Sequence, residues 1–568
     1  MLRFPPIRKS TPPGARRLTR TLALDKSFTQ DAPVADEPPA WIQQEERIDH
    51  QLVRGIGIPA LTANIVSSTI GAGIFVIPAT VAKGLGSAAP LAFVCCAIAM
   101  VLFVTCFAIA GSRVSLTGGL YAYVEVAFGR YVGFLAGMLY FLTALGAVAG
   151  VVNVLANSVA LVVPFLGSPL MRIIVMLAVY GLLVLINIRG VRQGAGAVTV
   201  ITVAKLLPLL LFICFGIFFI HPLNLAWSGW PSSKSLGDAV ILLIFAFVGI
   251  EVALIPSGEV KNPARTVPRS AYLALVVTTI IYLMIQLVAQ GTLGSDLAKY
   301  PDAPLAESAA KFLGNLGRMI LLTGASISAF GFVTSDILSS PRMIFAVGRD
   351  GVLPQFFAHV HPRYRSPDVA IITYAAIAFA LSISGTFERL AVLSNVAVLL
   401  MYLLCCAACW LLMQRDVRAD GAQPFNFPGM KIVPALAILA IIWILAHATK
   451  REFFITAVVI AEATLVYIAS YLDRRFRSKH PGTLPYRWGY YFSIHTPISV
   501  IIGAALLHYS IPVIVGLAAL YSLLAWRFAQ RNHWAWITLT ILSFNLLFWI
   551  AHCVYLSRRW REKYVLAG

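Results

Sequence analysis

Long apolar stretches alternate with short polar ones along most of the chain. Each of the apolar runs between about residues 56 and 472 is close to the ~20 residues that a helix needs to cross a bilayer. Lipid leaves backbone groups no outside partner, so we expect these runs to be helices. They fall near residues 56–83, 88–112, 119–151, 169–187, 195–220, 237–257, 270–292, 316–346, 368–385, 389–413, 432–449 and 452–472. The third could continue as far as Phe165 in a bent or surface-lying piece.

The pattern therefore predicts an all-α, polytopic membrane protein with 12 core transmembrane helices. Further apolar runs near 496–526 and 534–556 predict about two extra helices in a C-terminal extension, residues 474–568. Helices 1–10 would form a core over residues 55–413, and helices 11 and 12 would occupy residues 414–473. Residues 1–54 are polar, proline-rich and basic, which predicts a disordered tail.

Basic residues alternate in number from one loop to the next, and this sets an expected orientation. Lys and Arg accumulate in cytoplasmic loops of membrane proteins. The basic N-terminal tail would then be cytoplasmic, as would the loops that follow even-numbered helices. Those loops carry Arg113, Arg189, Arg192, Lys261, Arg265, Arg269, Arg349, Arg363, Arg365, Arg415, Arg418, Lys431, Arg474, Arg475, Arg477 and Lys479. We expect an integral protein of the plasma (inner) membrane.

Composition excludes several other classes of protein. Of the 568 residues, 59% are hydrophobic and only 12% are charged, which no soluble globular protein of this size matches. The net charge of +20 comes largely from short loops, so it predicts no nucleic-acid partner. All eight cysteines lie in apolar runs, where they are expected to pack. No metal, cofactor or disulfide framework is predicted.

The first apolar run contains a poor helix at its centre. Ser67, Ser68 and Thr69 are followed by Gly71-Ala72-Gly73, and Gly costs about 1 kcal/mol in a helix interior relative to Ala. A helix that opens at Ile70–Gly73 would present free amides on one side and free carbonyls on the other. Such groups can hold a carboxylate and an ammonium together, as in a small amino acid. The alternative is that these glycines only allow two helices to pack closely.

The sixth run is interrupted as well. Phe247-Val248-Gly249-Ile250-Glu251 places a Gly and an acid at mid-run, with Pro256 just beyond. Gly-interrupted segments five helices apart are typical of transporters built from inverted repeats, with the binding site between the interruptions. The repeats would cover about residues 55–220 and 237–413.

Three motifs in these runs resemble the amino acid–polyamine–organocation transporters. They are GAGIF at Gly71–Phe75, FxGxE at Phe247–Glu251 with the loop Gly258–Arg269, and the segment Ser328–Arg363. The resemblance covers about residues 55–413 and implies a LeuT-like 5+5 inverted repeat. Helices 1, 2, 6 and 7 would then rock against a scaffold of helices 3, 4, 8 and 9.

The resemblance also implies a substrate site. Amides would hold the substrate carboxylate at Ile70, Gly71, Ala72 and Gly73. Carbonyls would hold its ammonium group at Ser67, Ser68, Phe245 and the neighbouring Ala246 and Gly249. The Phe245 ring matches an aromatic lid over the substrate, unless it simply faces lipid or the protein core.

Charged residues inside the apolar runs are functional candidates. In proton-coupled relatives a Lys at the position of Lys205 stands in place of a sodium ion, which implies proton coupling here, with Ser326 and Ser328 as partners. Lys205 could instead extend to the membrane surface. Glu251 could titrate, or it could fix the sixth-helix interruption by accepting backbone N–H bonds. Asp336 could pair with Arg342 in a gate.

We therefore expect a secondary active transporter that takes up a neutral amino acid with protons by alternating access. An exchanger of amino acids or amines on the same fold is the main alternative, and an amino-acid sensor without transport is another. A membrane enzyme is disfavoured, because no His in an apolar run stands at motif spacing from an acid. The sequence leaves open the identity of the amino acid and the oligomeric state.

Overall fold

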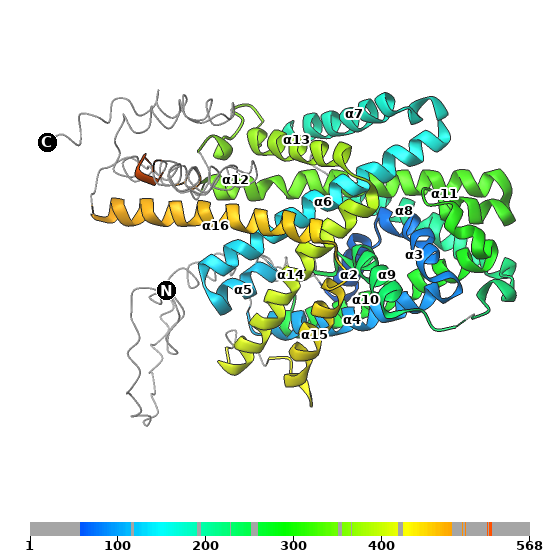
Figure 1. The fold of residues 1–568 in the computed structure, drawn as a ribbon, viewed down its shortest axis with the longest axis horizontal. Helices are drawn as coiled ribbons and strands as arrows, with labels where there is room; N and C mark the ends of the chain where they lie inside the picture. The colour runs from blue at the N-terminus through cyan, green and yellow to red at the C-terminus, as the bar shows by residue number, and fades with distance from the viewer. Residues whose placement is uncertain are drawn as a thin grey trace, which may run out of the picture.

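The computed structural model describes residues 57–479, with gaps at 115–118, 190–194, 228, 252–259, 350–354, 365 and 418–423, and also residues 491, 495, 520 and 522–524. Within these residues the fold consists of helices and contains no β-strand (Figure 1). The predicted N-terminal tail, and the predicted helices near 496–526 and 534–556, fall almost entirely outside the described residues.

Helices occupy every apolar run predicted between residues 56 and 472. In chain order the α-helices are α2 (Ile58–Thr69), α3 (Ile77–Leu85), α4 (Ala89–Gly111), α5 (Leu120–Phe128), α6 (Arg130–Val162), α7 (Pro169–Ile188), α8 (Ala195–Gly216), α9 (Ser233–Phe247), α10 (Pro263–Leu293), α11 (Pro304–Ser339), α12 (Pro341–Arg349), α13 (Asp368–Ser384), α14 (Phe387–Gln414), α15 (Val433–Leu445) and α16 (Lys450–Lys479). Short 3-10 helices join several of them, including η1 (Ala72–Phe75) and η2 (Gly86–Ala88).

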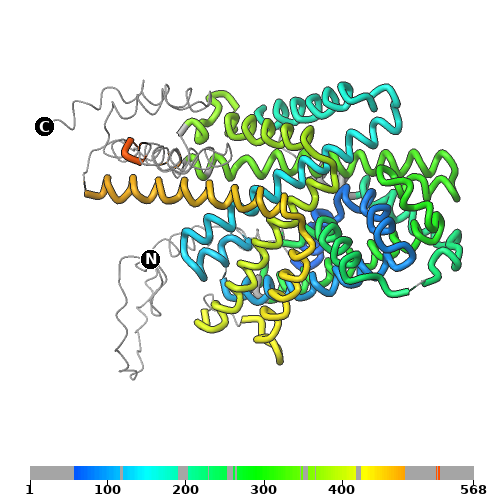
Figure 2. The backbone as a smooth tube through the Cα atoms, viewed as in Figure 1, coloured from blue at the N-terminus to red at the C-terminus, as the bar shows by residue number. Residues whose placement is uncertain are grey.

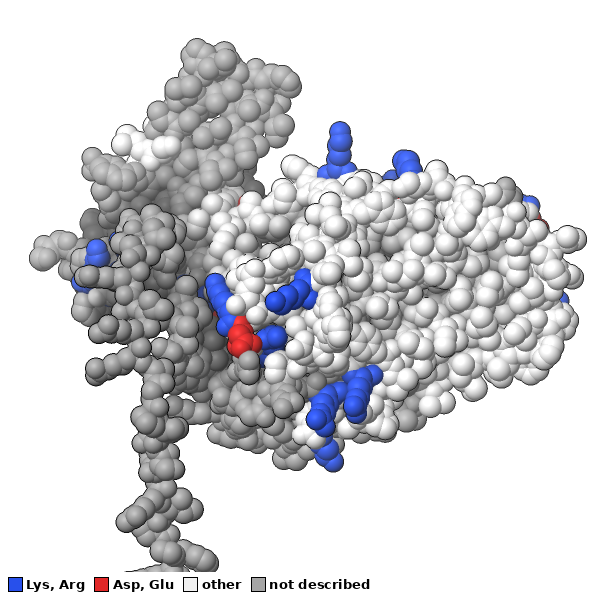
Figure 3. All heavy atoms as spheres, turned by 90° about the horizontal axis from the view of Figure 1, so that it is seen from below, with Lys and Arg blue, Asp and Glu red and all other residues white. Residues whose placement is uncertain are grey.

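Seven helical stretches of the described chain are long and apolar enough to cross a membrane. They are Ile77–Gly111, Arg130–Val162, Pro169–Ile188, Arg265–Lys299, Pro304–Phe345, Phe387–Gln414 and Lys450–Lys479. Shorter apolar helices cover Val203–Phe219, Asp368–Ser384 and Met430–Leu445. Much of the face in Figure 3 carries no charged side chain. These features indicate a polytopic membrane protein.

One predicted boundary was wrong, and glycine residues at positive φ interrupt two of the runs. The third run, expected at 119–151 with a continuation as far as Phe165, is interrupted at Gly129, whose φ is +88°, and α6 then continues to Val162, within that continuation. The eighth run was expected to begin near 316, but α11 begins at Pro304 and passes through Gly314 at φ +59°. Gly adopts positive φ without the steric penalty of other residues, so the chain bends there and remains helical on both sides.

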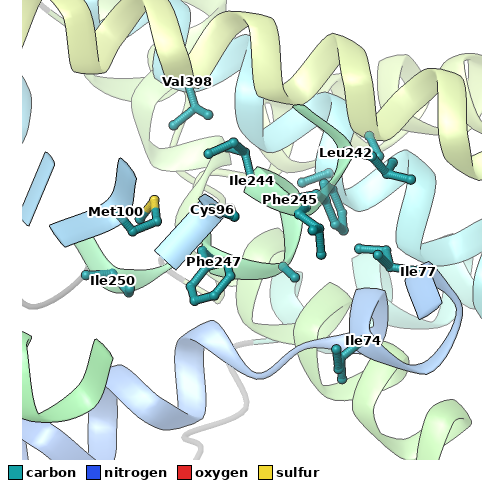
Figure 4. Packing of buried hydrophobic residues seen from close by; sticks show 14 of the residues in the cluster. Ile74, Ile77, Cys96, Met100, Leu242, Ile244, Phe245, Phe247, Ile250 and Val398 are labelled. Carbon is teal, nitrogen blue, oxygen red and sulfur yellow. The ribbon is translucent and has the colours of Figure 1, made fainter. Parts of the chain in front are cut away.

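The broken first and sixth helices lie at the centre of the packed core. The helix α10 packs against α2, α4 and α8, while α9 packs against α3, α4 and α14. In Figure 2 the segments α2 and α3 (dark blue) are surrounded by other helices, whereas the long α16 (orange) lies to one side of them, against α6 and α14. Apolar side chains from η1, α3, α4, α9 and α14 surround the end of α9 (Figure 4).

Candidate functional site

The first helix is interrupted where the Ser-Ser-Thr and Gly-Ala-Gly sequence predicts. The helix α2 ends at Thr69, and Ile70 and Gly71 are extended, with ψ values of 90° and −163°. Helical backbone resumes in η1 and then in α3. The break therefore removes the i→i−4 acceptors and donors of one helical turn inside the protein core.

The sixth helix is interrupted in the same way. The helix α9 ends at Phe247, Val248 is extended at ψ 136°, and Gly249 has φ +114°. Both helices thus end their hydrogen-bond ladders mid-run, and the C-terminal end of each carries partial negative charge.

The two interruptions meet at Ser68 and Gly249. The Ser68 hydroxyl lies 3.3 Å from the Gly249 carbonyl oxygen, and it also reaches the Asn64 and Ile65 carbonyls. A Cβ on Gly249 would stand 2.7 Å from the Ser68 carbonyl oxygen, closer than real Cβ contacts allow. Gly249 is therefore required twice, for its positive φ and for the close approach of the two backbones.

Side chains from two other helices bind carbonyls that the breaks release. Lys205 of α8 donates from Nζ to the Ser67 carbonyl. The Tyr282 hydroxyl of α10 lies 3.0 Å from the Thr69 oxygen and 2.8 Å from the Ala246 oxygen, so it bridges both broken helices. Tyr282 is fully buried. The Lys205 contact joins α8 to the first break. Lys205 was a candidate from the sequence, whereas Tyr282 was not.

The amides of the first break are partly free. The Ile70 N–H donates to the Val66 carbonyl at 2.9 Å, which closes the last turn of α2. The prediction that Ile70 supplies a free amide is therefore wrong. The N–H groups of Gly71, Ala72 and Gly73 come before the first bond of the 3-10 ladder in η1 and have no partner among the described residues. These three amides lie at the N-terminal end of η1, which carries partial positive charge.

The Phe245 ring lies against Gly73 at the end of this set of amides. A Cβ on Gly73 would stand 2.9 Å from Cδ1 of Phe245, so only glycine lets the ring lie so close. The Phe245 ring also meets Phe387 of α14 edge-on, with centroids 5.4 Å apart. Phe245 is 9% exposed. The contact places an aromatic side chain against η1, next to the first-helix break.

Glu251 lies beside the second break and is 4% exposed. Its Oε2 atom accepts the Gly249 N–H at 3.0 Å and the Tyr402 hydroxyl of α14 at 2.7 Å. This geometry matches the interpretation in which Glu251 fixes the conformation of the sixth-helix break. Tyr402 was not predicted, because a tyrosine in an apolar helix gives no local signal.

Neither of the two α11 serines forms a hydrogen bond with Lys205 in the described part of the chain. The Ser326 hydroxyl donates to Leu322 of its own helix at 2.9 Å. The Ser328 hydroxyl is buried and has no hydrogen-bond partner among the described residues. The expected gate pair of Asp336 with Arg342 is also wrong: Asp336 is bonded to hydroxyl groups, and Arg342 is exposed.

Comparison with known proteins identifies the family of this chain. Residues 56–471 match the family model described as amino acid permease. The chain is 27% identical over 413 residues to the serine/threonine exchanger SteT of Bacillus subtilis, a match that covers 70% of this chain and 91% of the relative. It is 29% identical over 434 residues to a methylthioribose transporter of the same organism, covering 73% and 93%. It is 25% identical over 424 residues to the branched-chain amino acid permease BcaP, covering 70% and 89%.

The family model covers well over half of the chain, and the relatives are matched over most of their own length. These relatives are named as transporters and permeases, and none as an enzyme. The chain belongs to the amino acid permease family of the amino acid–polyamine–organocation superfamily.

Proposed function

We propose that the protein is a secondary active transporter that takes up a neutral amino acid with protons. The observation that carries this proposal is the meeting of two interrupted helices at Ser68 and Gly249. Free amides and free carbonyls at such a junction suit a zwitterion, whose two charges are both satisfied by backbone dipoles. The relatives named for serine, threonine and branched-chain amino acids favour a neutral side chain, whereas two other relatives are named as cationic amino acid transporters.

The carboxylate would bind the amides of Gly71, Ala72 and Gly73. The ammonium would bind carbonyls at the C-terminal ends of α2 and α9, near Ser68 and Phe245. Lys205 already holds the Ser67 oxygen, and Tyr282 lies on the Thr69 and Ala246 oxygens. These two side chains therefore leave the Ser68 and Phe245 carbonyls as the better candidates for the substrate.

The wider arrangement is part of the same proposal. Residues 55–413 would form the transport core as two inverted repeats, 55–220 and 237–413, in the LeuT-like arrangement, with twelve spans in all and a cytoplasmic N-terminus. Its support is the position of the breaks in the first and sixth predicted segments, five helices apart. Movement of α2, α9 and α10 together against α6 and α11 would open the site to alternate sides of the plasma membrane.

Lys205 would couple this movement to protons. A charged amine inside a span is costly unless it has partners. Here Lys205 donates to the Ser67 carbonyl, whose oxygen has no helical donor because α2 is broken. Loss of the proton would weaken that donor and loosen α8 from α2. Glu251, hydrogen-bonded to Gly249 and Tyr402, would preserve the backbone conformation of the second break as α2 moves.

Reconstituted protein tests the function and separates symport from exchange. Purified protein is first screened by thermal shift against the twenty amino acids, since specific binding raises the melting temperature. Proteoliposomes are then loaded with buffer alone, and uptake of the best ligand is driven by an acidic exterior. Accumulation above the outside concentration supports proton symport. Uptake only into vesicles preloaded with substrate, indifferent to pH, would instead support an exchanger, as SteT is named. Binding without flux of either kind would overturn transport.

A pair of glycine variants tests the carboxylate site. Gly73→Ala places a methyl group against the Phe245 ring at 2.9 Å, whereas a Cβ at the exposed Gly84 of α3, outside the proposed site, has no neighbour within 4 Å. Both variants keep their amides. We expect Gly73→Ala to weaken substrate binding by about tenfold or more, equivalent to about 1.4 kcal/mol, and Gly84→Ala to bind nearly as the wild type does. Ligand-induced thermal shifts measure both, and equal affinity of the two variants would contradict the placement of Phe245 over the substrate.

A further inference from the structure

Asp336 is an acidic residue inside a candidate membrane span that the transport proposal does not use. It lies one turn before the end of α11, within the span Pro304–Phe345. Its Oδ2 atom accepts the Tyr374 hydroxyl of α13 at 2.5 Å, and its Oδ1 atom accepts the Ser340 hydroxyl at 2.8 Å. Tyr374 is fully buried. One carboxylate thus joins α11, the start of α12 and α13.

No basic side chain of the described residues forms an ion pair with this carboxylate. The nearby basic residue on α12, Arg342, is exposed. Among the ionisable side chains of neighbouring helices, Tyr374 of α13 is hydrogen-bonded to Asp336, and Tyr140 of α6 and Tyr180 of α7 lie near enough to feel its charge. Tyr140 also feels the charge of Glu251. The carboxylate therefore sits among phenols and hydroxyls, without a countercharge.

The hydrogen-bond pattern depends on the charge of Asp336. An ionised carboxylate only accepts, so it can receive both hydroxyl protons in strong charge-assisted bonds. A protonated carboxyl must donate its own proton, and then at least one of the two hydroxyl contacts is weakened or reversed. Because no cation holds the charge, a proton from solution is the partner that the site can take up. The Ser340 side of the cluster adjoins the exposed Ser339 at the end of α11.

Tyr374 connects Asp336 to the neighbouring helices, so a change in its hydrogen bond to Asp336 alters how those helices are held together. Its ring lies 5.8 Å from that of Phe141 on α6. Along α13, Ser382 is bonded to Tyr180 of α7 at 3.0 Å and accepts from Asn153 of α6 at 3.0 Å. The helix α13 is thus fastened to α6 and α7 at one point and to α11 through Asp336 at another. Release of the Asp336 contact would loosen α11 and α12 from this group.

We propose that Asp336, with Tyr374 and Ser340, forms a proton-binding site separate from the Lys205 contact with Ser67. In its ionised form the site fastens α11 and α12 to α13, and in its protonated form it lets them move. This inference rests on the proposed function only for the consequence that the proton changes the transport rate. Binding of the proton itself is a property of the site and can be measured without transport.

Infrared difference spectroscopy of the full-length protein in lipid tests the site directly. Between acidic and alkaline buffer, the wild type should show a carboxylic C=O band that disappears as the pH rises. Asp336→Asn should lose that band, and Tyr374→Phe should shift it, because one hydrogen bond to the carboxyl is removed. Asp238→Asn serves as the control, since Asp238 is a half-exposed acid paired with Lys234, and it should leave the band unchanged.

A second arm measures exchange of substrate across proteoliposomes with the same pH on both sides. Wild-type exchange should change with pH, and the Asp336→Asn rate should be flatter over the same range. Should Asp336→Asn fail to fold, the Tyr374→Phe band shift decides the matter. A spectrum in which neither variant alters any carboxyl band overturns the proton site, even if transport is normal. A band lost in Asp336→Asn without any measurable flux would uphold the site and count against the transport function.

Discussion

Lys205→Ala is expected to abolish pH-driven accumulation of substrate while retaining part of the exchange activity. The ammonium of Lys205 donates to the Ser67 carbonyl, one of those released where α2 ends. Without it, α8 loses a polar tie to the first break, and no proton need be taken up or released as α2 moves. The substrate site itself keeps the amides of Gly71–Gly73. Binding should therefore persist, whereas the link between substrate movement and the proton gradient should be lost.

The measurement compares uptake into proteoliposomes with and without an acidic exterior. Lys205→Ala should reach only the level set by equilibration, and the gradient should make no difference to it. Lys234→Ala is a suitable control because Lys234 is exposed and paired with Asp238 at the protein surface. Lys205→Arg keeps a positive charge but cannot be deprotonated in practice, so it should also uncouple. Gradient-driven accumulation in either Lys205 variant would remove the coupling role.

The interruptions after α2 and α9 could be predicted from the sequence because they depend on local chemistry. Three small polar residues followed by Gly71-Ala72-Gly73 weaken a helix whatever surrounds it, and the structure ends α2 at Thr69. Gly249 likewise marks the end of α9. Such positions report backbone preference, which is carried by the residues themselves.

The partners of the breaks could not be read from sequence because they come from distant segments. Tyr282 is 36 residues from Ala246 along the chain, and Tyr402 is 151 residues from Glu251. A tyrosine inside an apolar helix looks the same whether it packs or caps a free carbonyl. The error at Ile70 has a different origin. Whether the Ile70 amide, which follows the last helical residue, still donates to the carbonyl four residues earlier depends on the backbone angles at the end of α2. The residue at which a helix breaks is therefore easier to predict from sequence than the hydrogen bonds made by the backbone groups at the break.

Gly249→Ala is expected to damage the site more than any other single methyl group at the two breaks. Its φ of +114° is unfavourable for alanine, and the new Cβ would stand 2.7 Å from the Ser68 carbonyl oxygen. Backbone strain of this kind costs about 1–3 kcal/mol, which corresponds to roughly 5- to 150-fold in an equilibrium constant. The contact is with backbone, which cannot rotate away as a side chain can. The two broken helices must therefore move apart, and the geometry of their carbonyls changes.

Ligand-induced thermal shift and uptake should both fall sharply in Gly249→Ala, and the melting temperature of the ligand-free protein should fall as well. Gly84→Ala is the matched control: Gly84 is exposed in α3, and nothing lies within 4 Å of a Cβ placed there. Alanine is the better helix former, so this variant should be at least as stable as the wild type. If Gly249→Ala bound and transported substrate as Gly84→Ala does, the close approach of the two breaks would have no part in substrate binding. The site would then have to be sought elsewhere in the helix bundle.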